Sequence, residues 1–263
     1  MPINVNNCRI LPTRAVNGNF GAAIPSVAGA NANHRVVTAA TSRVTLAPLL
    51  DPVTGITSLG PAIDANGDTF FLPYAWDTIY SIELPAPAAA TAAGTTSFLT
   101  ADMSGCKIFV DPIAGGNGAV VVYHSNNVGN PPPLGSLPNV ETGPCTAFLD
   151  NLHNQARAYY QAAPRNLNLP LAGSASIAKP AYNLPATVEV QRKQGQHRAN
   201  VVFAGGTMVF GVVNNAKWDF YWETWGSTDY DRPKFAPKGW VKGLHHAAMQ
   251  GQNFRVLGSG LFF

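Results

Sequence analysis

Apolar residues at every second position recur along much of the chain, and this period predicts β-strands with one buried face. The pattern is clearest in four C-terminal segments, residues 187–191, 199–203, 207–213 and 218–225. Gly205-Gly206 separates the middle two, and we expect a tight Asn-Asn loop at 214–215 between the last two. The C-terminal third is therefore predicted to be an antiparallel meander, with residues 254–257 and 261–263 as candidates to close the sheet.

The first half of the chain carries fewer strand signals. Two clear strands are expected at residues 69–74 and 78–84, and shorter ones at 35–38 and 43–46. Residues 1–65 are otherwise rich in Asn, Ala, Gly and Pro, which predicts irregular wrapping with a few edge strands. The Pro/Ala-rich segment 85–94 has the composition of a linker.

One segment has the apolar spacing of a helix. Its apolar positions are Phe148, Leu149, Leu152, Ala156, Tyr159, Tyr160 and Ala163. Thr146 is the expected N-cap and Pro164 the expected stop. Many strands with little helix predict a mostly β (α+β) fold, an antiparallel or mixed β-sandwich with flanking helices. We expect residues 1–263 to form a single domain, with its core in 95–263 and the irregular wrapping in 1–65.

Composition narrows the classes of function. Hydrophobic residues make up 46% of the chain, enough for a large core, whereas charged residues make up only 12% and the net charge is +3. Because the basic residues are scattered, we expect no nucleic-acid partner and no membrane partner. The first residues lack the basic and apolar regions of a signal peptide, so an exported form would leave the cell by another route.

Cysteine use points to a reactive thiol. The chain has three cysteines, Cys8, Cys106 and Cys145, an odd number that argues against a disulfide framework and for a reducing working compartment. Cys106 begins a predicted hairpin whose strands, 107–110 and 119–123, flank a Gly-Gly-Asn-Gly turn. A reversal centred near Gly115 would pair position 106 with 124, 108 with 122 and 110 with 120. Cys106 would then face His124 directly, with Cβ atoms about 4.5 to 5.5 Å apart, the geometry of an activated thiolate.

The residues before Cys106 suit a nucleophile. Ser104 and Gly105 give the backbone freedom to aim N–H groups at a substrate carbonyl, and Gly105 has no side chain to block access.

The Ser104-Gly105-Cys106 element with a histidine on the next strand resembles the bacterial toxin glutamine deamidases, the family of the Burkholderia lethal factor and the catalytic domain of the cytotoxic necrotizing factors. In that family the motif is Leu-Ser-Gly-Cys, and here Met103 stands in place of the leucine. Thr100 lies six residues before Cys106, where the lethal factor has a catalytic threonine. The histidine is farther from the cysteine than in those relatives, which a longer turn over 111–118 would absorb. The resemblance covers residues 97–126.

The resemblance implies an enzyme that hydrolyses a glutamine side-chain amide on a host protein. Cys106 would be the nucleophile, His124 the general base, and Thr100 the residue that orients the imidazole. Relatives act on a translation-initiation helicase or on Rho-type GTPases. The implied protein is a virulence effector that is secreted or injected without a classical signal peptide and acts in the host cytosol. We expect a monomer with no cofactor and no metal, with transglutamination as a side activity.

The sequence also allows two alternative functions. Low charge and Asn/Gly/Pro-rich loops also suit a non-enzymatic β-sandwich that serves as a coat, adhesin or binding module. Cys145, at the expected start of the helix, is a rival nucleophile for a cysteine peptidase.

The pair His245-His246 lacks further ligands at metal-binding spacing. In 218–225 the alternation places Trp218, Phe220 and Trp222 on one face, which favours core over a ligand platform. Loops 126–138 and 227–239 are our candidates for substrate contact.

Overall fold

The structure is a computed structural model of the 263-residue chain. It describes residues 9–10, 22–23, 34–38, 42–50, 57–64, 66–75, 77–101, 103, 105–126, 143–182, 187–193, 196–229 and 254–263. Cys8, Ser104 and His245-His246 lie outside the described residues, as do nearly all of the two candidate substrate loops.

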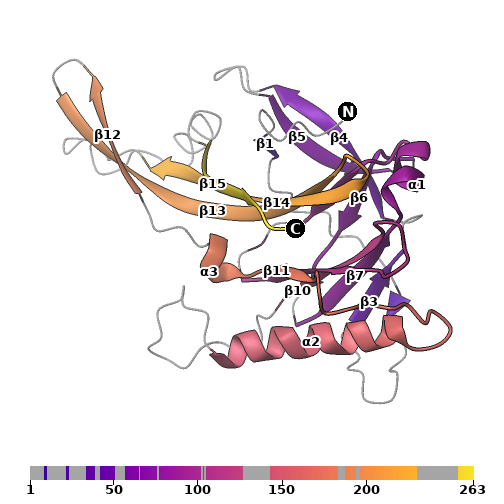
Figure 1. The fold of residues 1–263 in the computed structure, drawn as a ribbon. Coiled ribbons are helices and arrows are strands. Elements are labelled where there is room, and N and C mark those ends of the chain that lie inside the picture. The colour runs from indigo at the N-terminus through magenta and orange to yellow at the C-terminus, as the bar shows by residue number, and fades with distance from the viewer. Residues whose placement is uncertain are drawn as a thin grey trace.

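Two mixed β-sheets form the body of the molecule, which confirms the predicted mostly β sandwich (Figure 1). In order, sheet A contains β1 (Arg9–Ile10), β5 (Thr57–Ile63), β4 (Arg43–Leu50), β6 (Thr69–Leu72), β8 (Ser97–Thr100), β13 (Gln196–Asn214), β14 (Lys217–Asp229) and β15 (Phe254–Leu261), with β12 (Thr187–Lys193) also paired to β13. Sheet B contains β11 (Ala175–Ile177), β9 (Lys107–Pro112), β10 (Val120–Ser125), β7 (Ile79–Leu84), β3 (His34–Val37) and β2 (Ala22–Ala23). Parallel pairs occur at β1/β5, β3/β7 and β6/β8.

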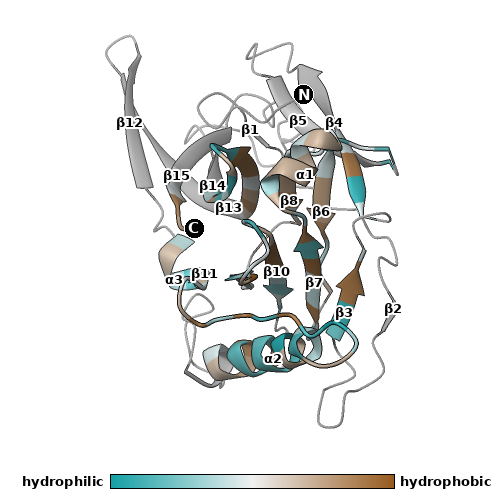
Figure 2. Ribbon diagram, turned by 45° about the vertical axis from the view of Figure 1, so that its right-hand side comes forward, coloured by the Kyte–Doolittle hydropathy of each residue, from teal (hydrophilic) through white to brown (hydrophobic). Residues whose placement is uncertain are grey.

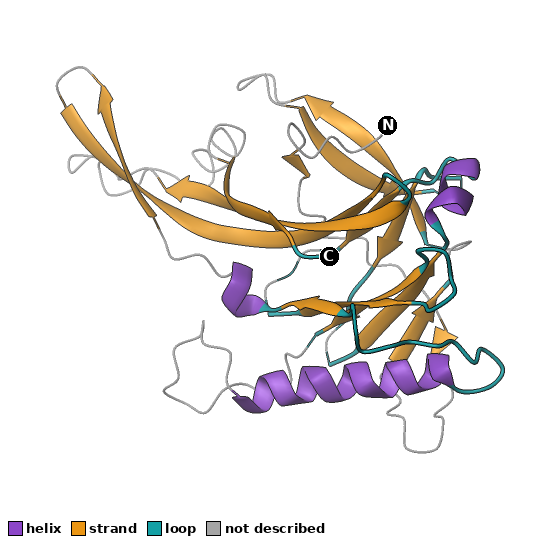
Figure 3. Ribbon diagram, viewed as in Figure 1, coloured by secondary structure: helices purple, strands orange, loops and turns teal. Residues whose placement is uncertain are grey.

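Helix α2 (Gly143–Gln161) adds a third layer on the outer face of sheet B (Figure 3). It starts three residues before Thr146, so the predicted N-cap is wrong and Thr146 lies inside the first turn. The helix mixes hydrophilic and hydrophobic residues, as a helix with one buried face does (Figure 2).

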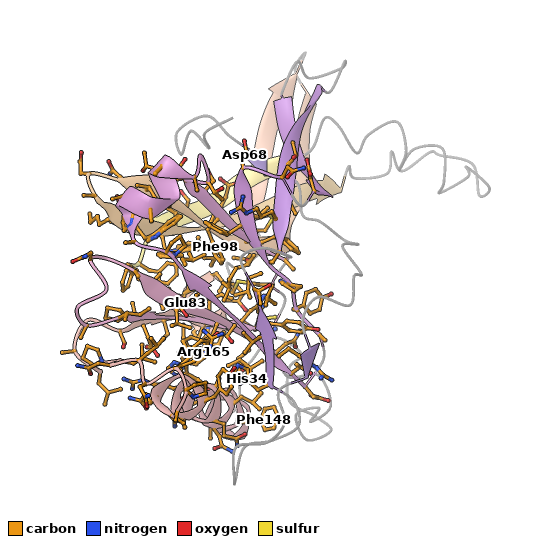
Figure 4. The ribbon with its side chains drawn as sticks, turned by 90° about the vertical axis from the view of Figure 1, so that its right-hand side faces the viewer. His34, Asp68, Glu83, Phe98, Phe148 and Arg165 are labelled. Carbon is orange, nitrogen blue, oxygen red and sulfur yellow. The ribbon has the colours of Figure 1, made fainter. Side chains whose placement is uncertain are left out.

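Alternation along the strands of sheet B fills two cores. Phe98, Val110 and Val122 belong to the core between the sheets, whereas Tyr123 and Tyr160 belong to the core under α2. Figure 4 shows the same division, with Phe98 toward sheet A and His34 and Arg165 nearer the helix. Each face of β9 and β10 therefore packs into one of the two cores.

Several sequence predictions need correction. Segment 85–94 is not a plain linker, because Pro87–Ala92 forms the short helix α1 with proline in its first turn. Positions 199–203 and 207–213 belong to one continuous strand, β13, with a register shift between Ala204 and Gly206. The loop after β13 is Asn215-Ala216, and both residues have positive φ.

The N-terminal part carries more regular structure than the irregular wrapping we expected. β3 lies beside β7, and β4 and β5 extend sheet A. In the part of the chain that the structure describes, no helix combines the length and apolar character that a membrane span requires.

Candidate active site

The β9–β10 hairpin forms as predicted, but its register differs. His124 pairs with Ile108, Val122 with Val110 and Val120 with Pro112. The predicted pairing of 106 with 124, 108 with 122 and 110 with 120 is therefore wrong by two positions. The cause lies in the turn, where Asn117 and Gly118 adopt positive φ and move the centre of the reversal to Gly116.

A two-position shift keeps every side chain on its original face, because the side-chain period of a strand is two. Cys106 lies in the core between the sheets together with Ile108 and Val122, and His124 follows Val122 on the same face of β10. Cys106 precedes the first paired residue of β9, Lys107, so continuing the ladder by one residue would set it opposite position 126 and diagonal to His124 rather than directly opposite it. Such pairs have Cα atoms about 7 to 8 Å apart, still within reach of longer side chains. Both residues are fully buried.

His124 is fully buried. Burial lowers the pKa of its imidazole from 6.5 to about 3, so the ring is uncharged at neutral pH. The Leu72 backbone near the ring favours the protonated form but does not make a contact with hydrogen-bond geometry. Neither ring nitrogen has a hydrogen-bond partner among the described residues, Cys106 included, so the structure does not form the thiol–imidazole hydrogen bond that we expected. A buried polar group in this state calls for an explanation, and a catalytic role is one of few.

Tyr74 covers the solvent side of this histidine. Its ring centroid lies 5.8 Å from that of His124, at an interplanar angle of 37°. The Tyr74 side chain is 41% exposed, although it packs against a histidine that is not exposed at all. Sequence reasoning missed Tyr74, because the pattern predicts it to be the last residue of the strand 69–74, whereas β6 ends at Leu72.

Thr100 lies at the end of β8 in sheet A, across the inter-sheet core from the hairpin. It pairs with Leu72, whose backbone also approaches the His124 ring, so both residues neighbour Leu72. The Thr100 hydroxyl oxygen accepts a hydrogen bond from the Val209 N–H at 3.1 Å. The hydroxyl proton of Thr100 is therefore directed away from that N–H. The role of Thr100 in orienting His124 stays a prediction.

Gly105 provides open space beside the nucleophile. Apart from its two chain neighbours, no atom of the described residues lies within 4 Å of a Cβ added at Gly105, and Gly105 is partly exposed next to the fully buried Cys106. Ser104, the other predicted support residue, is outside the described residues. Among the described residues of the site, the backbone at Gly105 therefore has room beside it for an incoming group.

Tyr182 is a further residue at the site that sequence reasoning missed. It ends the short helix α3 (Lys179–Tyr182) and donates a hydrogen bond from its hydroxyl to the Cys106 carbonyl at 2.7 Å. No sequence signal could have found it, since 75 residues intervene and α3 has no periodic pattern.

The rival residues lie elsewhere. Cys145 is in the first turn of α2, as expected, and His153 is on the same helix. His153 Nε2 is 3.1 Å from Asp111 Oδ2, in the core under α2 and away from the inter-sheet face. Trp218 and Phe220 are buried in the inter-sheet core, which agrees with the predicted core role of this stripe.

Two buried polar clusters fasten α2 to sheet B. In the first, Asp111 contacts His153 and the Arg157 Nε at 3.3 Å. Burial raises the pKa of Asp111, but the hydrogen bond and charge of His153, with the charge of Arg157, outweigh this and leave it below its usual value.

The second cluster is a chain of hydrogen bonds. His34 Nε2 contacts Ser81 Oγ at 2.8 Å, and Ser81 Oγ contacts the Tyr160 hydroxyl at 2.9 Å. Burial lowers the pKa of His34 to about 4.

Comparisons of the chain with protein-family models, with curated proteins and with solved structures find no match.

Proposed function

We propose that the chain is a cysteine hydrolase that deamidates glutamine side chains, with Cys106 as nucleophile and His124 as general base. The observation that carries the proposal is the state of His124. It is fully buried on the same sheet face as Cys106, and neither ring nitrogen is hydrogen-bonded to a described residue. An uncharged imidazole with no hydrogen-bond partner among the described residues is available to accept the Cys106 proton once the two side chains approach each other.

The chemistry follows from the two side chains. Cys106 Sγ attacks the carboxamide carbon of glutamine while its proton passes to His124. The imidazolium then protonates the departing ammonia, and a thioester remains on Cys106. His124 next removes a proton from water, which attacks the thioester; the imidazolium returns this proton to Cys106 Sγ as the C–S bond breaks, and glutamate leaves. An amine in place of water would give transglutamination.

The electrostatics favour a concerted first step. With the pKa of His124 lowered to about 3 by burial, a resting thiolate–imidazolium pair is disfavoured. The resting site therefore holds a neutral thiol and a neutral imidazole, and charge develops only as the carbonyl is attacked. Backbone N–H groups near Gly105 would bind the resulting oxyanion.

The substrate class comes from the resemblance of Thr100, Ser104-Gly105-Cys106 and His124 to the toxin deamidases. By that resemblance the substrate is a host protein, such as a translation-initiation helicase or a Rho-type GTPase. The protein would then be a secreted or injected effector that acts in the host cytosol.

A second candidate function is a non-enzymatic β-sandwich binding module. The complete burial of Cys106 and His124 favours it, because a cysteine used only for packing is expected to be inaccessible. On this alternative, Cys106 is alkylated only when the protein unfolds.

The deciding experiment incubates the protein with eukaryotic cell lysate and searches for glutamines that gain the mass difference between an amide and an acid. We expect specific glutamines to be converted by the wild type and none by Cys106→Ser. Cys145→Ser is the matched control and should retain the activity. Equal conversion by Cys106→Ser would exclude Cys106 as the nucleophile.

A further inference from the structure

The segment that carries the proposed nucleophile is held at both ends. At its start, Met103 and Thr207 of β13 exchange backbone hydrogen bonds, from the Met103 N–H at 2.7 Å and from the Thr207 N–H at 3.3 Å. At its end, the Cys106 carbonyl accepts the hydroxyl proton of Tyr182 at 2.7 Å. Gly105, which lies between the two anchors, has no side chain of its own to pack.

The two anchors are connected to each other. The Thr224 hydroxyl donates to the Tyr182 carbonyl at 3.0 Å, and it also contacts the Thr207 hydroxyl at 2.8 Å. A hydroxyl has one proton, so Thr224 accepts from Thr207 in the second contact. Hydrogen bonds thus link Met103 to Thr207, Thr207 to Thr224, Thr224 to Tyr182 and Tyr182 to Cys106, and the covalent chain from 103 to 106 closes this ring.

This ring is buried. The exposed fractions of Tyr182, Thr207 and Thr224 are 3%, 2% and 1%. Hydrogen bonds in a low-dielectric interior are costly to break without a replacement, so the ring fixes its members in one arrangement. The ring connects α3, β13 and β14 to the segment that contains Gly105 and Cys106.

We infer that Tyr182, Thr224 and Thr207 are positioning residues that hold the backbone of Gly105 and Cys106 in the shape that binds the oxyanion. The inference rests on the proposed function of Cys106. Preorganised N–H groups stabilise a developing oxyanion only if they do not have to reorganise during the reaction, and small misplacements are expensive. Because Gly105 is intrinsically free to move, the Tyr182 hydroxyl supplies the constraint that the sequence of the segment lacks.

The test is Tyr182→Phe, which removes the hydroxyl and keeps the ring. We expect kcat for ammonia release from eukaryotic cell lysate to fall about tenfold to a hundredfold, with KM nearly unchanged. Thr224→Val should act in the same direction. The matched control is Tyr160→Phe, which removes a buried, hydrogen-bonded hydroxyl from the core under α2 and should keep the wild-type kcat.

A second readout does not depend on activity. Amide hydrogen exchange at Gly105 and Cys106 should be faster in Tyr182→Phe than in the wild type and unchanged in Tyr160→Phe. Unchanged exchange in Tyr182→Phe would overturn the inference whether or not the protein is an enzyme. So would a wild-type kcat in that variant, or an equal loss in Tyr160→Phe. If the wild type had no deamidase activity but amide exchange were faster in Tyr182→Phe, the proposed function would be refuted. The role of Tyr182 in holding the backbone of Gly105 and Cys106 would still stand.

Discussion

Replacement of Gly105 by alanine should separate stability from activity. The added Cβ meets no atom within 4 Å, and Gly105 does not have the positive φ that would strain an alanine. The substitution also reduces the conformational freedom of the unfolded chain. We therefore expect Gly105→Ala to leave the free energy of unfolding unchanged or to raise it by about 0.4 to 1 kcal/mol.

Activity should respond in the opposite direction. The open space beside Gly105 is where a glutamine carboxamide would approach the buried Cys106, and a methyl group there displaces the reacting carbon. A displacement of about 1 Å costs about a hundredfold in rate, so we expect a loss of that order in ammonia release. Unfolding in urea and the rate of ammonia release from cell lysate measure the two effects.

Gly115→Ala is the matched control, because its added Cβ also meets nothing within 4 Å, but its φ is +75°. It should lower stability by about 1 to 2 kcal/mol through backbone strain and leave the activity of the folded protein intact. If Gly105→Ala retained full activity, the approach from the Gly105 side would be wrong. If it were destabilised like Gly115→Ala, the open space described at Gly105 would be wrong.

Three further predictions concern the buried groups. Burial lowers the pKa of His34 to about 4 and that of His124 to about 3, so both side chains bind more protons in the unfolded state and the free energy of unfolding should fall as the pH drops below 6.5. Urea unfolding at pH 7 and at pH 5 should show a loss of about 2 kcal/mol per histidine. If the loss in His124→Gln were as large as in the wild type, this prediction would be contradicted. Asp111→Asn should lower the free energy of unfolding by about 3 kcal/mol, since Arg157 would keep an uncompensated buried charge; a calorimetric Tm equal to that of the wild type would contradict it. Tyr74→Ala should speed Cys106 alkylation by iodoacetamide severalfold, because it uncovers His124; an unchanged rate would show that Tyr74 is not the cover.

Local patterns predicted the strands and the faces of the hairpin well. Period two in 107–110 and 119–123 placed Cys106 and His124 on one face, and a register error of two positions did not change that. The error itself came from the turn, where sequence alone does not reveal that Asn117 and Gly118 take positive φ. Local strand signals therefore fix which residues share a face more firmly than which residues pair.

What the sequence could not predict depends on contacts between distant segments. β3 inserts beside β7 in parallel, a pairing that no local pattern specifies. Tyr182 reaches Cys106 only because β11 and α3 return to the edge of sheet B next to β9. The complete burial of His124 arises from the packing of two sheets, so its pKa of about 3 could not be inferred from the residues beside it in the sequence.

The most direct test of the Cys106–His124 pair is the rate at which iodoacetamide labels Cys106 in the folded protein, mapped by mass spectrometry and compared with His124→Gln. The proposed pair predicts that Cys106 is labelled without unfolding and that His124→Gln slows this labelling at least tenfold, because the neutral imidazole accepts the thiol proton as the sulfur attacks the reagent. Labelling that occurs only at the rate of global unfolding, and equally in both proteins, would contradict the pair and favour the non-enzymatic module.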